Sequence, residues 1–236
     1  MNRPSGILID FGETLVGDLK YDPLAGHLRL LELAKGSQDI RPEDLHQAIR
    51  SLDEEIKPLR DSSLLEFPFL KYQQLLYARL NLSFHLPLTM VELEFWKASM
   101  SYSPEPGVLE ALATLVPYGL KMGVVSNSPF SGSVLAWELQ RHNLLKGIDF
   151  VLSSADCGLQ KPHRLLFSLG AWQLGRAPSE VWFIGDTLDY DVLGSLQAGL
   201  WTIWYNRFGS QGGGVVPHAE AGNWEEITAL VQRYLK

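Results

Sequence analysis

Residues 8–16, LIDFGETLV, decide how the rest of this chain is interpreted. An apolar run stops at one acidic residue, Asp10, a glycine-containing turn follows, and apolar residues resume at Leu15. Continuously apolar strands are typical of a parallel sheet that is covered on both faces. The stretch therefore predicts a buried strand over residues 6–10 that ends on a single carboxylate.

Four other segments repeat this pattern further along the chain. They are MGVVS at 122–126, FVLS at 150–153, VWFIG at 181–185 and WTIWY at 201–205, with helical patterns between them. Such alternation predicts an α/β fold with right-handed crossovers. Helix starts are indicated by the serines of SNSPFSGS (126–133) and by Asn223 with Glu226, which resembles a capping box.

The first crossover is far longer than the few dozen residues that one strand–helix–strand unit needs. Its sequence has helical patterns at 24–35, 42–56, 69–80 and 89–99, and Thr89 with Glu92 resembles a capping box at the start of the last one. We therefore predict a core made of residues 1–17 and 104–236, interrupted by a helical domain at 18–103.

Composition and net charge exclude several classes of binding partner and site. Hydrophobic residues make up 46% and charged residues 20%, as in ordinary globular proteins. A net charge of −7 without a basic block argues against nucleic acid. The single cysteine, Cys157, excludes a disulfide or a thiolate zinc cluster within one chain.

Location is predicted from the same features. The apolar run near the N-terminus is too short for a signal peptide, and no stretch is apolar for long enough to cross a bilayer. With one cysteine, these features predict a cytoplasmic protein without a membrane segment.

Polar side chains fall where the predicted strands end. Asp10, Ser126 and Asp186 each end or follow a strand, and Asp191 comes one turn later in GDTLDYD. Lys161 precedes a proline, which favours an extended backbone that can direct a long side chain inward. Ligands of parallel sheets gather at this carboxyl edge, so we expect these groups to converge.

Clustered carboxylates repel one another unless a hard cation joins them, and Mg²⁺ accepts oxygen ligands. The cation attracts an anionic group, and a phosphoryl group fits these residues. Lys161 and Ser126 can contact its oxygens while the Asp10 carboxylate attacks phosphorus. The result is an aspartyl-phosphate intermediate, which water then hydrolyses.

The chain resembles the haloacid dehalogenase superfamily through ILIDFGETLV (7–16), VVSNS (124–128), KP (161–162) and FIGDTLDYD (183–191), in that order. The resemblance extends over nearly all of the predicted core. It implies a Rossmann-like parallel sheet, and the insert resembles the helical cap of that superfamily in its position.

The resemblance also implies roles for individual residues. Asp10 is the expected nucleophile, Ser126 and Lys161 bind and neutralise the phosphoryl group, and Asp10 and Asp186 ligate Mg²⁺. Asp191 is expected to ligate the ion directly or through water, and residue 12 to contribute its backbone carbonyl. The implied function is an Mg²⁺-dependent phosphatase of a small phosphorylated metabolite, acting as a monomer or a homodimer.

One position departs from the pattern. Gly12 stands where phosphatases of the superfamily have a second aspartate, which protonates the leaving group. General acid–base help is worth about 10²–10⁴-fold in rate, so we expect slow turnover that favours good leaving groups. Glu13 is adjacent and could replace this acid, although the next residue of a tight turn usually points elsewhere.

Other interpretations remain open at this point. Dehalogenases and phosphonate hydrolases of the superfamily also lack this aspartate, and the latter need a cap lysine, for which Lys57, Lys71 and Lys97 are candidates. A catalytically weak relative that binds a phosphorylated ligand or a protein is a third hypothesis. Asn127 is a candidate substrate ligand or a turn residue. Tyr21, Lys71, Tyr72 and Lys97 could contact the substrate, although packing and solvated charge explain them as well.

Overall fold

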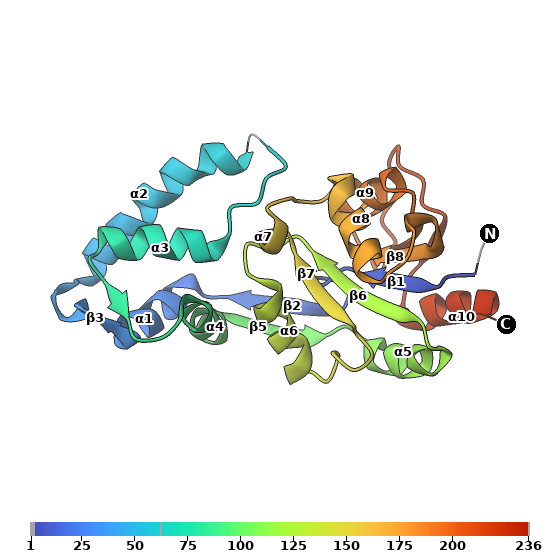
Figure 1. Cartoon of the computed structure of the whole chain (residues 1–236), viewed down its shortest axis with the longest axis horizontal. Helices are drawn as coiled ribbons and strands as arrows, with labels where there is room; N and C mark the ends of the chain where they lie inside the picture. Colours follow the sequence, from blue (N-terminus) through green and yellow to red (C-terminus); the bar gives the residue numbers. More distant parts are fainter. Residues whose placement is uncertain (1–2, 62, 236) are drawn as a thin grey trace.

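A computed structural model describes residues 3–61 and 63–235 (Figure 1). Its centre is a parallel sheet of six strands in the order β10-β9-β8-β1-β6-β7. The strands are β1 (Gly6–Ile9), β6 (Lys121–Ser126), β7 (Phe150–Ser153), β8 (Val181–Gly185), β9 (Trp201–Tyr205) and β10 (Ala219–Ala221). The predicted α/β fold and its five strands are confirmed, whereas β10 was missed because its three residues contain no apolar run.

Helices cover both faces of this sheet. In β1, Ile7 and Ile9 belong to one buried cluster and Leu8 to another, because successive strand residues point to opposite faces. The elements that complete the core are α5 (Val108–Leu115), η2 (Val116–Tyr118), α6 (Gly132–Arg141), α7 (Ser154–Cys157), α8 (Arg164–Gln173), η3 (Pro178–Glu180), η4 (Leu188–Val192), α9 (Leu193–Gln197) and α10 (Trp224–Leu235).

The predicted insert, residues 18–103, forms the predicted helices. Two strands that pair antiparallel, β2 (Val16–Tyr21) and β5 (Met100–Pro104), lead into and out of it. Figure 1 shows its four helices at the opposite end of the molecule from α10. The elements are α1 (Pro23–Leu33), β3 (Ala34–Lys35), η1 (Ser37–Asp39), α2 (Pro42–Asp61), α3 (Phe69–Arg79), β4 (Ser83–Phe84) and α4 (Leu88–Ser99).

Two of the predicted helix caps take other roles. Asn223 does accept a hydrogen bond from the backbone N–H of Glu226 (2.9 Å) at the start of α10, as predicted. The Thr89–Glu92 capping box is wrong, because α4 already begins at Leu88 and Glu92 is fully buried. Glu92 instead accepts from both the N–H (3.1 Å) and the hydroxyl (2.6 Å) of Ser131. Ser131 precedes α6, but its side chain does not cap the helix. Its hydroxyl donates to Glu92 on α4 instead.

The inserted segment meets the core at two further places. The indole N–H of Trp96 on α4 donates to the buried Glu138 carboxylate on α6 (2.9 Å). The residues before α3 also pair with the loop after α7, where the N–H of Gln160 donates to the carbonyl of Leu64 (2.8 Å). The insert is thus anchored to the core through α4 and through this loop.

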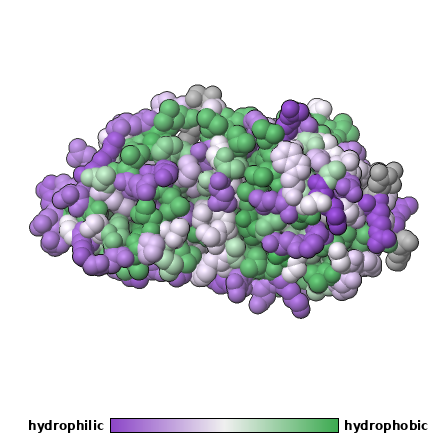
Figure 2. Space-filling model, in the orientation of Figure 1, coloured by the Kyte–Doolittle hydropathy of each residue, from purple (hydrophilic) through white to green (hydrophobic). Residues whose placement is uncertain are grey.

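Hydrophilic residues are spread along the outline of the face in Figure 2, with hydrophobic residues among them. Within residues 3–61 and 63–235, no helix is both long enough and apolar enough to cross a membrane.

Candidate active site

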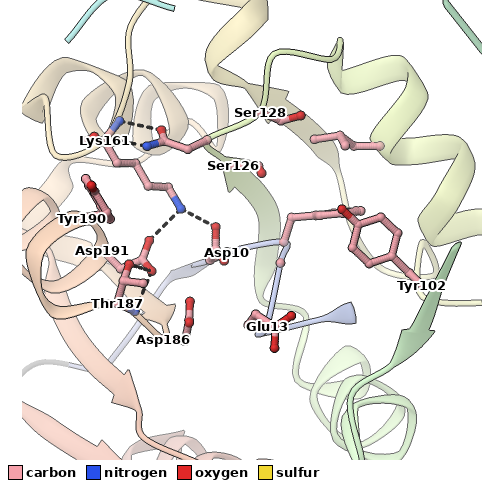
Figure 3. A pocket seen from close by; sticks show the side chains of 14 residues that line it. Asp10, Glu13, Tyr102, Ser126, Ser128, Lys161, Asp186, Thr187, Tyr190 and Asp191 are labelled. Carbon is pink, nitrogen blue, oxygen red and sulfur yellow. Dashed lines mark hydrogen bonds and ion pairs between the residues drawn. The ribbon is translucent and has the colours of Figure 1, made fainter. Parts of the chain in front are cut away.

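A cavity of about 270 Å³ opens at the carboxyl ends of β1, β6 and β8 (Figure 3). All seven site residues that the sequence predicted line it, so the expected convergence is present in the fold. The cavity is lined by Asp10, Phe11, Gly12, Glu13, Tyr102, Ser126, Asn127, Ser128, Leu135, Lys161, Asp186, Thr187, Tyr190 and Asp191.

Asp10 follows β1 directly, and its N–H donates to the carbonyl of Ile184 on β8 (2.9 Å). The buried Lys161 ammonium donates to Asp10 Oδ1 (2.5 Å), and no hydrogen bond to Asp10 Oδ2 is formed by a side chain in the described part of the chain. Burial by itself lowers the pKa of a lysine, but the carboxylates of Asp10 and Asp191 outweigh it and raise the pKa of Lys161. Lys161 is therefore a fixed positive charge beside the Asp10 carboxylate.

Asp191 is held on both of its oxygens. Oδ1 accepts from the Lys161 ammonium (2.7 Å), and Oδ2 accepts from the N–H (3.0 Å) and hydroxyl (2.7 Å) of Thr187. Gly185 makes room for it, because a Cβ atom at that position would lie 2.5 Å from the Asp191 carboxyl carbon. This explains in packing terms why GDTLDYD begins with glycine.

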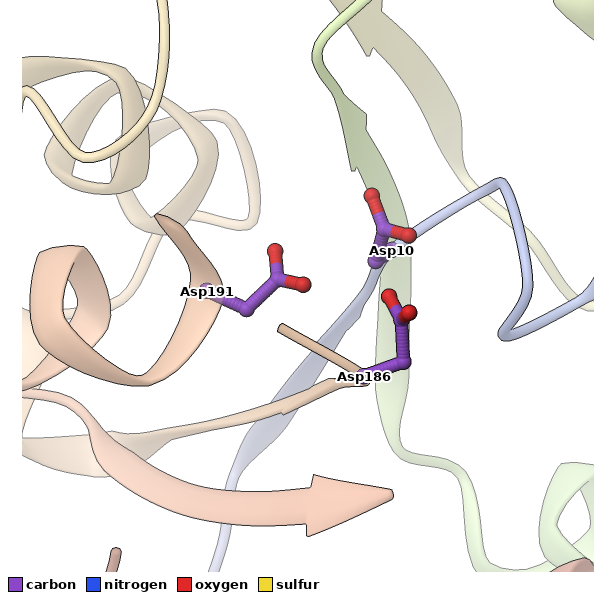
Figure 4. A group of neighbouring side chains, drawn as sticks. All are labelled: Asp10, Asp186 and Asp191. Atoms are coloured by element: carbon purple, nitrogen blue, oxygen red, sulfur yellow. The ribbon is translucent and has the colours of Figure 1, made fainter. Parts of the chain in front are cut away.

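Three carboxylates that line the cavity lie close to one another (Figure 4). One oxygen each from Asp10, Asp186 and Asp191 lie within 4.8 Å of one another. Burial, together with the neighbouring carboxylates, raises the pKa of Asp186 to about 7. Burial also raises the pKa of Asp10 to about 6, with Asp191 adding to the effect and Lys161 opposing it. The cluster thus carries more negative charge than one ammonium neutralises.

This donor set fits a hard divalent cation. Asp10 and Asp186 each place a carboxylate oxygen in this group, and such oxygens are the ligand type that Mg²⁺ prefers. The indole N–H of Trp204 donates to the backbone carbonyl of Asp186 (2.7 Å), which fixes that residue. Asp191 has both oxygens occupied by protein donors, so contact through water suits it better than direct ligation.

Ser126 ends β6, is buried and lines the same cavity as Asp10 (Figure 3). Asn127 makes a contact that the sequence did not indicate. Its side-chain oxygen accepts from the Lys161 N–H (2.6 Å) and its amide donates to the Lys161 carbonyl (3.2 Å). Asn127 therefore holds the backbone of Lys161 in place, and its contact with substrate stays a prediction.

Gly12 and Glu13, in the turn after β1, have very different surroundings. A Cβ atom at Gly12 would meet no atom within 4 Å, so the position is open toward the cavity. Glu13 has a positive φ of 54°, and its carboxylate forms an ion pair with Arg207, which also pairs with Glu105. Glu13 is thus engaged by an arginine from the segment after β9.

Three residues with evident contacts in the site were missed from the sequence: Tyr102, Thr187 and Arg207. Thr187 lies inside the quoted GDTLDYD and its spacing of four residues from Asp191 is a usable local signal. Tyr102 and Arg207 come from β5 and from the end of β9, so no local pattern identifies them.

The candidate residues of the insert lie elsewhere. None of Lys57, Lys71 and Lys97 is among the residues that line this cavity. Tyr21 and Tyr72 line a second cavity of about 490 Å³, between α1, α2 and α3 and the Pro129–Phe130 segment.

Comparisons with known proteins agree with this geometry. A family model described as haloacid dehalogenase-like hydrolase matches residues 71–205. The chain is 29% identical over 134 residues to the pyrimidine 5'-nucleotidase YjjG of Escherichia coli K12, covering 56% of this chain and 58% of that protein. It is 33% identical over 105 residues to a glyceraldehyde 3-phosphate phosphatase of Methanopyrus kandleri, covering 44% of each.

The chain spans about half the length of these curated relatives. Among solved structures, a 2-haloacid dehalogenase from Pseudomonas syringae pv. Tomato DC3000 superimposes with a TM-score of 0.64 at 19% identity. That match covers 99% of this chain and 100% of the other. At this identity the likeness establishes the shared fold, and the chemistry has to be argued from the site.

Proposed function

This chain belongs to the haloacid dehalogenase-like hydrolases, and from that premise we propose that it is an Mg²⁺-dependent phosphatase of a small phosphorylated metabolite. The observation that carries the proposal is the arrangement around Asp10. Its carboxylate is held by the buried Lys161 ammonium, lies close to the Asp186 and Asp191 carboxylates, and lines the cavity.

The proposed reaction begins with attack by one Asp10 carboxylate oxygen on phosphorus, while the other oxygen is left to the cation. Lys161 and the Ser126 hydroxyl contact the phosphoryl oxygens and stabilise the charge that develops on them. The bond to the leaving group breaks, and the product is an aspartyl phosphate on Asp10. Water then releases phosphate and restores the carboxylate.

Asp10, Asp186 and the backbone carbonyl of Gly12 would hold Mg²⁺, with Asp191 acting through water. When bound, the ion supplies positive charge that neutralises a phosphoryl oxygen. A bound cation would also relieve the repulsion between the clustered Asp10, Asp186 and Asp191 carboxylates.

We also propose that residues 18–103 act as a cap over this cavity, and residues 1–17 and 104–236 as the catalytic core. The family resemblance and the position of the insert between β1 and β6 support this division. The substrate is proposed to be small, because the cavity measures about 270 Å³.

Phosphonate hydrolysis has less support, because the three candidate lysines do not line the cavity. A binding role without turnover is the remaining alternative. It would not explain why a buried carboxylate and a buried ammonium are held together at the cavity wall.

The proposal is tested by measuring phosphate release from an aryl phosphate with Mg²⁺, with chelator, and with the Asp10→Asn variant. We expect release that requires both Mg²⁺ and Asp10. Equal rates for wild type and Asp10→Asn would refute the phosphatase assignment.

A further inference from the structure

The turn after β1, which carries Gly12, leaves the proposed reaction without a general acid for the leaving group. Gly12 carries no acid, and the Glu13 carboxylate is engaged by Arg207. An alkyl phosphate nevertheless requires a proton for its leaving oxygen, because an alkoxide is a poor leaving group. A proton donor must therefore come from another part of the cavity wall.

Most hydroxyl and ammonium groups of the wall are committed elsewhere. Lys161 donates to Asp10 and Asp191, and Thr187 donates to Asp191. The Ser128 hydroxyl accepts a hydrogen bond from the N–H of Phe130 and keeps its own proton, but an aliphatic hydroxyl is a much weaker acid than a phenol. Ser126 is assigned above to the phosphoryl oxygens.

Tyr102 is placed differently from all of these. It stands on β5, and Figure 3 shows its hydroxyl end directed from that strand toward the side of the cavity that holds Asp10 and Ser126. Among residues 3–61 and 63–235 its hydroxyl has no hydrogen-bond partner. The hydroxyl is thus available to a bound molecule.

The ring of Tyr102 is fixed by aromatic neighbours. Phe11, which follows the nucleophile, packs edge-on against it at 5.5 Å between ring centroids, and Trp96 stacks on it at 5.7 Å. Trp96 is in turn held by its hydrogen bond to Glu138. This packing leaves the hydroxyl as the part of the side chain that is free to react.

On this geometry, and resting on the phosphatase function proposed above, we propose that Tyr102 is the catalytic residue that protonates the leaving group, in place of the aspartate absent at position 12. As the bond between phosphorus and the leaving oxygen breaks, its electron pair stays on that oxygen, which takes the phenolic proton. The Tyr102 phenolate then accepts a proton from the water that hydrolyses the aspartyl phosphate, so the phenol is regenerated.

The chemistry of a buried phenol agrees with this role. Burial, with Glu138 and Asp10 contributing, raises the pKa of Tyr102 to about 12, so the side chain carries its proton at neutral pH. An alkoxide is a stronger base than a phenolate and can accept that proton, whereas an aryl leaving group with a low pKa has little need of it.

The test compares Tyr102→Phe with wild type on two substrates, an alkyl phosphate and 4-nitrophenyl phosphate. We expect alkyl phosphate turnover to fall about 10²-fold while 4-nitrophenyl phosphate turnover changes little. Tyr190→Phe removes the other tyrosine hydroxyl of the cavity and is the matched control, in which the ratio of the two rates should stay as in wild type.

A second arm separates proton donation from a structural effect. In a Gly12→Asp background the new carboxyl supplies the proton, so the loss caused by Tyr102→Phe should shrink to a few-fold. Equal losses on both substrates, or an undiminished loss in the Gly12→Asp background, would overturn the role of Tyr102 while leaving the phosphatase function intact. Wild-type rates that do not depend on Asp10 would overturn both.

Discussion

Position 12 shows how one missing side chain changes a reaction without changing the fold. A glycine there preserves the turn after β1 and the backbone carbonyl, but it removes the carboxyl group nearest to the expected leaving group. The absence of any atom within 4 Å of a Cβ at this position means that an aspartate would fit without displacing a neighbour.

The Gly12→Asp variant should therefore gain activity. We expect alkyl phosphate turnover to rise about 10- to 10²-fold, because a carboxylic acid is a stronger proton donor than a phenol. The rise for 4-nitrophenyl phosphate should be much smaller, and steady-state kinetics on both substrates measures the difference. Equal gains on the two substrates would count against loss of a general acid as the step that limits the wild type.

His27 gives a residue-scale prediction about stability. Burial, with a smaller contribution from His46, lowers its pKa from 6.5 to about 4, so the folded state holds the ring neutral. Between pH 6.5 and 4 the unfolded chain binds a proton that the folded protein does not, and stability is lost as the pH falls. The loss between pH 7 and pH 4.5 amounts to about 2–3 kcal/mol.

Urea unfolding at pH 7 and pH 4.5, for wild type and for His27→Leu, measures the contribution of His27 to the pH dependence of stability. The wild type should lose about 2–3 kcal/mol more than the variant on going to pH 4.5. The exposed His85 serves as the control site, since His85→Leu should keep the wild-type pH dependence. The same pH dependence in wild type and His27→Leu would refute the assignment.

At the scale of elements, α4 is joined to α6 by buried polar contacts. Glu92 accepts two hydrogen bonds from Ser131, and burial raises the pKa of its carboxyl group. Removing the acceptor leaves the partly buried Ser131 N–H without this partner. We expect Glu92→Ala to lower the free energy of unfolding by about 1–3 kcal/mol.

Glu92→Gln is the matched variant, because its carbonyl oxygen can still accept from Ser131. Its loss in denaturant unfolding should be clearly smaller than that of the alanine variant. If both variants unfold at the wild-type denaturant concentration, the link between α4 and α6 contributes nothing to stability.

The strands and the residues at their ends are the part of the structure that could be predicted from the sequence. The strands at 6–10 and 181–185 were identifiable because each is a short apolar run that stops at a polar residue. Since the carboxyl ends of parallel strands meet at one edge, the convergence of Asp10, Ser126 and Asp186 followed from their positions at the strand ends. Lys161 was found through its position before a proline and through the family resemblance.

What the sequence could not provide depends on contacts between distant segments. The Thr89–Glu92 spacing satisfied a local rule, but Ser131 from the core competes for the Glu92 carboxylate and wins. Tyr102 stands on β5, which pairs with β2, the strand that follows the turn after Asp10, so its place at the cavity depends on a pairing between distant segments. Likewise, the ion pair between Arg207 and Glu13 joins the segment after β9 to the turn after β1, which are far apart in the sequence.

At the scale of the whole molecule, the segment before α3 closes onto the loop that carries Lys161. The Glu66 carboxylate accepts from the Ser154 hydroxyl (2.7 Å) and from the Gln160 side-chain amide (3.1 Å). Because Gln160 immediately precedes Lys161, this contact ties the inserted segment to the proposed catalytic lysine.

We expect Glu66→Ala to loosen this closure. Losing two hydrogen bonds to a charged acceptor should speed exchange of the Gln160 backbone amide hydrogen, which is bonded to Leu64, by about tenfold or more. Hydrogen exchange followed by mass spectrometry measures it, with Glu43→Ala on the exposed face of α2 as control. Unchanged exchange at Gln160 would mean that the closure does not depend on Glu66.

The central claim is that Asp10 becomes covalently phosphorylated. The most direct measurement mixes the protein with Mg²⁺ and an aryl phosphate, quenches with acid within the first turnover, and locates the added mass by peptide mass spectrometry. The account predicts one phosphoryl group on the peptide that contains Asp10, removable by hydroxylamine and absent from Asp10→Asn or with chelator. Phosphate release without that adduct, or an adduct on another residue, would contradict it.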